Sequence, residues 1–175
     1  MPEDLGSEQI RSILEILGKR IQVPARLFLL GGGALALLGS PRLTIDIDFI
    51  GDDVSPSALD TTIVQTAKEL HIYAEPVALE RFIPLPAGSQ DRAVPIGQFG
   101  NLEVYVADPY SIALSKLDRG FDTDIDDIIF LIQHGYVKLE ELQHVMQEAL
   151  PCAREFDMDA AGMVAHLQIV RARMK

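Results

Sequence analysis

Leu29-Leu30-Gly31-Gly32-Gly33-Ala34, followed by Arg42-Leu43-Thr44-Ile45-Asp46-Ile47-Asp48-Phe49, decides the fold of this chain. An apolar strand over residues 26–30 ends at three glycines, a short helix is expected over 34–38, and a second strand over 43–50 contains two carboxylates at i and i+2. Because side chains alternate along a strand, Asp46 and Asp48 are expected on one face. Ile45, Ile47 and Phe49 are expected on the other face, towards a core.

Two like charges held side by side cost stability unless a cation neutralises them. Hard oxygen ligands at this spacing suit Mg²⁺ or Mn²⁺, and glycines at positions 31 and 32 would let a phosphate approach the backbone. Taken alone, a glycine run is typical of a tight turn, and an Asp-Ile-Asp strand is typical of a half-exposed edge. Their combination, in this order and joined by one short helix, favours a metal–triphosphate site.

This pairing resembles the nucleotidyltransferase superfamily of the polymerase-beta type, and most of all its AbiEii-like group of minimal bacterial enzymes, many of them encoded in toxin–antitoxin loci. A second block from Lys116 to Ile128 resembles that group's downstream motif of Lys-Leu, an Arg and Asp-x-x-Asp on a helix. Together the two blocks cover roughly residues 25 to 135. The matching residues of the first block are Gly31, Gly32, Ala34, Leu35, Gly39, Arg42, Thr44, Asp46 and Asp48.

The resemblance implies transfer of a nucleoside monophosphate from a nucleoside triphosphate to a hydroxyl acceptor. It implies catalytic roles for Asp46, Asp48, Lys116 and Asp127, and a metal held by Asp46 and Asp48 with Glu103 as a candidate third ligand. The implied nucleotide-binding residues are Gly31, Gly32, Arg42, Thr44 and Lys116.

Two of these assignments have structural alternatives. Lys116 either holds triphosphate oxygens or pairs with Asp124 or Asp127, which share a helix face at i and i+3. Asp127 either positions an acceptor hydroxyl or has a structural role, and for Asp124 we expect the structural role. Glu103 either binds metal or is a solvent-facing residue of the strand over 102–106.

Other phosphate and metal motifs do not fit. Gly31-x-Gly33-x-x-Ala36 matches the dinucleotide fingerprint, but Gly39-Ser40-Pro41 ends the helix after barely two turns and the carboxylates lie inside the next strand. The same tripeptide stands where a Walker A loop needs Gly-Lys-Ser/Thr. The acidic run over 122–127 fails as a calcium loop, because its sixth and twelfth positions are Asp127 and Gln133.

The composition sets further limits on function. The chain has 175 residues, 48% of them hydrophobic, and a net charge of −11, so nonspecific nucleic-acid binding through a basic surface is not expected. Cys152 is the sole cysteine, which excludes a disulfide framework. An acidic start and the lack of an 18-residue apolar stretch predict no signal peptide and no membrane span, so we expect a cytoplasmic protein.

We therefore expect an α/β fold: a small mixed β-sheet of the nucleotidyltransferase type with the carboxylate strand central, packed helices and a helical C-terminal portion. The predicted domains are a core over residues 1–135 and a helical extension over 136–175. The expected partners are a nucleoside triphosphate and an RNA, protein or small-molecule acceptor. The alternative function is a non-catalytic partner of the same fold in a toxin–antitoxin pair.

Overall fold

A computed structural model describes residues 3–175 and confirms the α/β class. The chain forms two compact units: the first contains the residues up to Ala78 together with Ala93–Ala107, and the second contains Leu79–Arg92 and Asp108–Lys175. This packing does not test the predicted domain boundary at residue 135, which stays a prediction. In the first unit the elements are α1 (Ser7–Arg20), β1 (Ala25–Leu30), α2 (Gly31–Leu37), β2 (Asp46–Ile50), α3 (Ala58–Glu69), β3 (Tyr73–Val77), β4 (Val94–Phe99) and β5 (Leu102–Val106). In the second they are η1 (Leu79–Arg81), η2 (Ser89–Arg92), α4 (Pro109–Arg119), α5 (Asp122–Gln133), α6 (Leu139–Ala149), η3 (Leu150–Cys152) and α7 (Ala160–Arg173).

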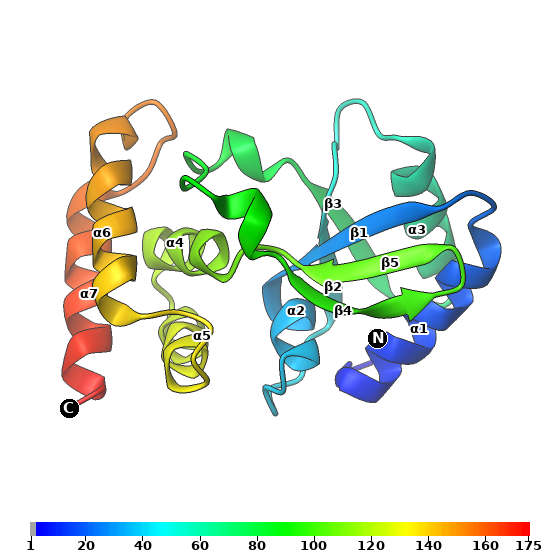
Figure 1. The fold of residues 1–175 in the computed structure, drawn as a ribbon, viewed down its shortest axis with the longest axis horizontal. Coiled ribbons are helices and arrows are strands. Elements are labelled where there is room, and N and C mark those ends of the chain that lie inside the picture. Colours follow the sequence, from blue (N-terminus) through cyan, green and yellow to red (C-terminus); the bar gives the residue numbers. More distant parts are fainter. Residues whose placement is uncertain (1–2) are drawn as a thin grey trace. The chain divides into compact units, whose positions relative to one another are not determined.

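The first unit is built on a mixed five-stranded sheet with the order β3-β2-β1-β5-β4 (Figure 1). Strand β1 runs antiparallel to β2 and parallel to β5, β2 is parallel to β3, and β4 and β5 form an antiparallel pair. The carboxylate strand β2 is interior, but β1 occupies the middle position that we expected for β2. Asp46 and Asp48 therefore have a paired strand on either side.

Helices α1 and α3 cover one face of this sheet. Apolar side chains from both helices meet those of β1, β2 and β3, and each such side chain stabilises the fold by about 1.5–3 kcal/mol when fully buried. Close packing also needs Gly18, since a Cβ there would lie 1.9 Å from the Phe99 carbonyl oxygen. The side chains that meet in this layer include Ile13, Leu14, Leu17, Leu27, Ile47, Ile63, Ala67 and Ala74.

Two local predictions in the deciding stretch need correction. Helix α2 begins at Gly31, so the glycines form the first helical turn instead of a loop that precedes a helix at Ala34. Strand β2 begins at Asp46, and Ile45 is 50% exposed where we expected it to be buried. The reason is that Thr44 forms an isolated β-bridge with Leu5. The residues before β2 therefore pair with the N-terminal segment and do not continue the strand.

The second unit is helical and starts from a strongly capped helix. The Asp108 carboxylate accepts hydrogen bonds from the backbone of Tyr110 and Ser111, at 3.1 and 3.2 Å, and forms a bidentate ion pair with Arg92 at 2.8 and 2.7 Å. Helix α4 ends at Gly120, whose φ of +68° favours glycine. Helices α5, α6 and α7 all pack on α4, which confirms the helical C-terminal portion.

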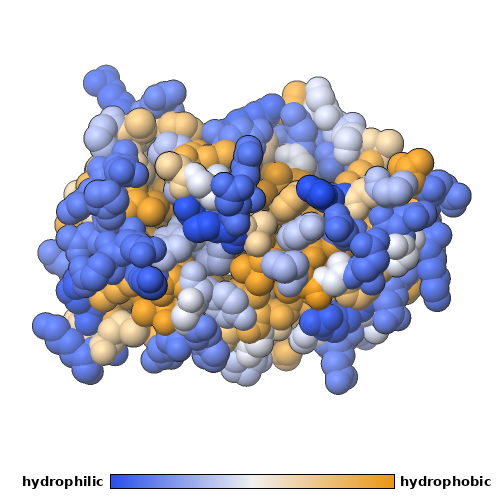
Figure 2. Space-filling model, viewed as in Figure 1, coloured by the Kyte–Doolittle hydropathy of each residue, from blue (hydrophilic) through white to orange (hydrophobic). Residues whose placement is uncertain are grey.

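The face drawn in Figure 2 combines hydrophilic and apolar residues. The largest exposures among apolar residues are 73% for Val54 and 67% for Val23. Among the helices of residues 3–175, none has both the length and the apolar character needed to cross a bilayer.

Candidate active site

Asp46 and Asp48 lie on the same face of β2, as the sequence predicted. Their neighbours Ile47 and Phe49 are buried, with 3% and 0% exposure, and the two aspartates are half-buried. Since α1 and α3 pack on the side of Ile47, the carboxylates belong to the sheet face that these helices leave open.

The glycine turn lies directly beside Asp48. Leu30 at the end of β1 pairs with Asp48, and Gly31 follows with a φ of +64°. A Cβ at Gly31 would lie 2.7 Å from Oδ2 of Asp48, so another residue would force the carboxylate to move. The glycine turn and the aspartate strand are thus in contact at Gly31 and Asp48. Glycine is favoured at position 31 both by the positive φ and by the short distance to the Asp48 carboxylate.

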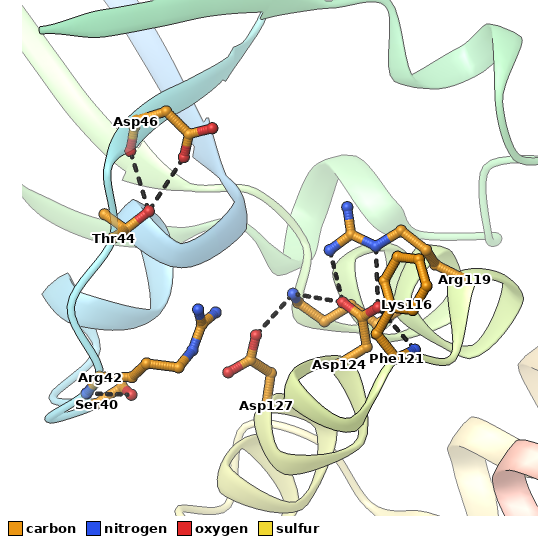
Figure 3. Close-up of polar contacts among 9 residues, drawn as sticks. All are labelled: Ser40, Arg42, Thr44, Asp46, Lys116, Arg119, Phe121, Asp124 and Asp127. Atoms are coloured by element: carbon orange, nitrogen blue, oxygen red, sulfur yellow. Dashed lines mark hydrogen bonds and ion pairs between the residues drawn. The ribbon is translucent and has the colours of Figure 1, made fainter. Parts of the chain in front are cut away.

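Arg42 and Thr44, which precede β2 in the chain, also lie beside the glycine turn. The Thr44 hydroxyl donates to Oδ1 of Asp46 at 3.1 Å and also lies 3.3 Å from its carbonyl oxygen (Figure 3). A Cβ at Gly32 would lie 2.9 Å from Oγ1 of Thr44 and 3.4 Å from a guanidinium nitrogen of Arg42. Thr44 therefore orients Asp46, and the structure brings both residues together with the glycine turn.

Glu103 is not brought to the aspartate pair. It is in register with Arg26 at the start of β1, and its Oε2 accepts a hydrogen bond from Nε of Arg26 at 3.0 Å. Asp48 is in register with Leu30, four residues further along the same strand, which is about 13 Å at the usual rise per residue. A role for Glu103 beside Asp46 and Asp48 has no support in this geometry.

The donor set at β2 nevertheless fits a hard divalent cation. Across residues 3–175, no group of three or more His, Cys, Asp or Glu side chains is placed to hold a metal ion. Mg²⁺ usually binds one or two protein carboxylates and completes its six ligands with water and substrate phosphates. Asp46 and Asp48 supply that number of carboxylates, next to a backbone turn that a phosphate could approach.

The sequence analysis missed one carboxylate on this face. Glu75 on β3 is in parallel register with Asp48, so its side chain leaves the sheet on the same side, and it is exposed. Pro76 directly follows Glu75, and proline is disfavoured inside a sheet, so the sequence around Glu75 does not indicate a strand clearly. Proline is tolerated on an edge strand, and β3 is an edge of this sheet.

In the second unit, Lys116 lies in a buried ionic cluster. Its Nζ is 2.8 Å from Oδ2 of Asp127 and 3.4 Å from Oδ1 of Asp124 (Figure 3), and the residue is only 5% exposed. Arg119 donates to both oxygens of Asp124, at 2.9 and 2.6 Å. These contacts agree with the predicted alternative in which Lys116 pairs with Asp124 or Asp127. Both aspartates lie on the face of α5 that packs against α4.

The ionisation of Asp124 reflects this cluster. Burial acts to raise the pKa of Asp124, but hydrogen bonds from Arg119 and the charges of Lys116 and Arg119 outweigh it, so the pKa lies below the ordinary value. A further hydrogen bond comes from the Phe121 amide at 3.1 Å, which ties the carboxylate to the start of α5. Asp124 is therefore ionised at neutral pH and joins the end of α4 to the first turn of α5.

Comparison with known proteins identifies the family of this chain. A family model described as a nucleotidyltransferase of unknown function (DUF6036) matches residues 8–170. No curated protein and no solved structure matches the chain. Since the match covers most of the chain, the chain belongs to this family of nucleotidyltransferases.

Proposed function

We propose that this protein is a metal-dependent nucleotidyltransferase that moves a nucleoside monophosphate from a nucleoside triphosphate to a hydroxyl acceptor, with pyrophosphate as the leaving group. The observation that supports it most is the meeting of the glycine turn with Asp48, where a Cβ at Gly31 would come within 2.7 Å of the carboxylate. Because no side chain projects from the turn at this point, phosphate oxygens and a cation can come close to both the backbone and the carboxylate.

Each residue of the site has a distinct task in this proposal. Asp46 and Asp48 hold Mg²⁺ or Mn²⁺, and Thr44 fixes the orientation of the Asp46 carboxylate through its 3.1 Å hydrogen bond. The backbone at Gly31 and Gly32 lies against the triphosphate, and Arg42 adds positive charge beside it. When bound, the metal would neutralise phosphate charge and lower the pKa of the acceptor hydroxyl. Catalysis then comes mainly from positioning and charge neutralisation.

The buried ionic cluster around Lys116 has a structural role in this proposal. Lys116 and Asp127 are paired at 2.8 Å and buried, so we assign them to the stability of the α4–α5 pair. Triphosphate binding by Lys116 and acceptor positioning by Asp127 are the competing assignments from the sequence. Substitution of Lys116, treated in the Discussion, separates them.

A second candidate is a non-catalytic interaction protein of the same fold, acting as the nucleotidyltransferase-fold partner in a toxin–antitoxin pair. The net charge of −11 favours this candidate, because a strongly acidic surface attracts a basic partner. A basic protein would then bind the chain independently of nucleotide and of Asp46 and Asp48.

The deciding experiment follows label from nucleotide to acceptor. The protein is incubated with Mg²⁺, a cell extract and each of the four nucleoside triphosphates labelled in the α-phosphate. We expect the wild type to transfer label to one class of macromolecule or small molecule, and Asp46→Asn/Asp48→Asn to transfer none. The charge-matched control Glu8→Gln/Glu15→Gln alters exposed residues of α1 and should act as the wild type does.

Equal labelling by the wild type and the aspartate variant would contradict the assignment of this site. Failure of the wild type to bind any nucleotide, together with tight binding to a basic protein, would establish the second candidate instead.

A further inference from the structure

The open face of the sheet contains a stacked aromatic pair. Phe28 on β1 and Tyr105 on β5 are in register, with ring centroids 5.2 Å apart and planes inclined by 19°. Both are half-buried, and alternation places them on the face of Asp46 and Asp48, because their neighbours Leu27 and Val104 belong to the buried side.

The pair lies within the reach of a nucleotide held at the aspartates. Leu30 is opposite Asp48, so Phe28 is two residues back along β1. From the usual strand rise and spacing, the Cα of Asp48 is about 8 Å from that of Phe28 and about 12 Å from that of Tyr105. The glycine turn continues from Leu30 in the opposite direction. A ligand with its phosphates at the turn would therefore place its other end over the rings.

Beyond the rings, the same face ends in a polar hollow of about 360 Å³. Arg26 and Glu103 precede the aromatic pair on β1 and β5, and their ion pair of 3.0 Å forms part of the wall. The volume lies within the range of small-molecule pockets, and the wall offers guanidinium, carboxylate and amide groups. The lining residues are Pro24, Ala25, Arg26, Gln98, Asn101 and Glu103.

We propose that the stacked pair of Phe28 and Tyr105 offers an outer ring face on which the nucleobase stacks, with the hydrogen-bonding edge of the base directed into the hollow at Arg26, Gln98 and Glu103. Every base has a π-face, so stacking on the rings supplies affinity without selecting a base. The polar groups of the hollow supply the selection, because the pattern of hydrogen-bond donors and acceptors on the base edge must match them. This inference rests on the proposed function, and it gives Glu103 a task away from the metal.

The test compares nucleoside triphosphates with inorganic tripolyphosphate, which has three linked phosphates but no nucleoside. Calorimetric titrations with Mg²⁺ measure the Kd of ATP, GTP, CTP, UTP and inorganic tripolyphosphate. Tyr105→Leu removes the ring, and Tyr105→Phe keeps it. The control Tyr73→Leu removes an aromatic side chain that is 60% exposed and lies on the same sheet face, in register with Asp46 but on β3, so that β2 separates it from the aromatic pair.

We expect Tyr105→Leu to weaken binding of all four nucleotides by about 5- to 150-fold, the range for loss of one base–aromatic stack. Its Kd for tripolyphosphate should stay within about twofold of the wild type, which also shows that the site remains folded. Tyr105→Phe and Tyr73→Leu should both bind like the wild type. If Tyr105→Leu does not fold, Phe28→Leu serves as the second variant with the same expectations.

Equal effects on ATP and tripolyphosphate, or no effect on either, would overturn the inference and leave the proposed function standing. The rings would then be only a cross-strand pair that stabilises the sheet. If the wild type binds neither ligand, the proposed function fails and the subsite fails with it. Glu103→Gln should change the order of affinity among the four nucleotides, and an unchanged order would overturn the role of the hollow.

Discussion

Replacement of Lys116 by methionine should destabilise the protein and leave nucleotide affinity nearly unchanged. Breaking a buried ion pair by removal of one partner costs about 3–5 kcal/mol, because the remaining charge is left without its compensation. Here Asp124 keeps both hydrogen bonds from Arg119, so the cluster retains one of its cations when the ammonium 2.8 Å from Asp127 is removed. We therefore expect the lower end, about 3 kcal/mol in the free energy of unfolding.

Urea denaturation followed by circular dichroism measures this change as a shift of the midpoint at constant m-value. The control Lys138→Met removes an exposed lysine paired with Glu141 at 3.6 Å, and it should change the free energy of unfolding by less than about 0.5 kcal/mol. The combination of Lys116→Met with Asp127→Asn should be less destabilised than the sum of the single variants, by about 0.5–3 kcal/mol. An unchanged midpoint for Lys116→Met, with weaker binding of Mg²⁺–ATP, would refute the structural role and restore Lys116 as a triphosphate ligand.

Three further predictions concern the site and the cluster. Gly31→Ala should lower the free energy of unfolding by at least about 1–2 kcal/mol, since φ is +64°, and a melting curve equal to that of the wild type would contradict the close approach. Thr44→Val should cost about 1 kcal/mol in stability and weaken Mg²⁺-dependent ATP binding in calorimetry, because Asp46 loses its 3.1 Å hydrogen bond; unchanged affinity would argue against an orienting role. The lowered pKa of Asp124 provides stability that is present above the unfolded value of about 3.9 and is lost as pH falls towards the folded pKa. Below pH 4 the free energy of unfolding should therefore depend less steeply on pH in Asp124→Asn than in the wild type, and equal slopes in urea denaturation would oppose this.

Much of the first unit could be predicted from local patterns. Helix α1 has its buried side chains at helical spacing, and β5 alternates between buried and half-buried residues from Leu102 to Val106, as expected. In the second unit, Asp108-Pro109 is typical of a helix start, an acidic N-cap followed by proline, and α4 begins there. In each case the residues that define the element are close together in the sequence. A single local property, such as the spacing of apolar residues or the capping of a helix, is then enough to predict it.

The remainder depended on contacts between distant residues. Ile45 is exposed because Thr44 pairs with Leu5, which lies nearly forty residues away in the chain. Glu103 had the chemistry of a metal ligand, but its distance from Asp48 follows from strand register. Register is fixed by the whole sheet, so neither the local sequence nor the family motif determined it.

The central claim is that Asp46 and Asp48 together hold the cation through which a nucleotide binds. It is tested most directly by calorimetric titration of Mg²⁺–ATP into the wild type, Asp46→Asn/Asp48→Asn and the control Glu8→Gln/Glu15→Gln, with the free energy of unfolding measured for each. We predict that the aspartate variant is at least as stable as the wild type, because a like-charge repulsion is removed, and that its Mg²⁺-dependent ATP binding is lost while the control retains it. Undiminished Mg²⁺-dependent binding in a folded Asp46→Asn/Asp48→Asn variant would contradict the account.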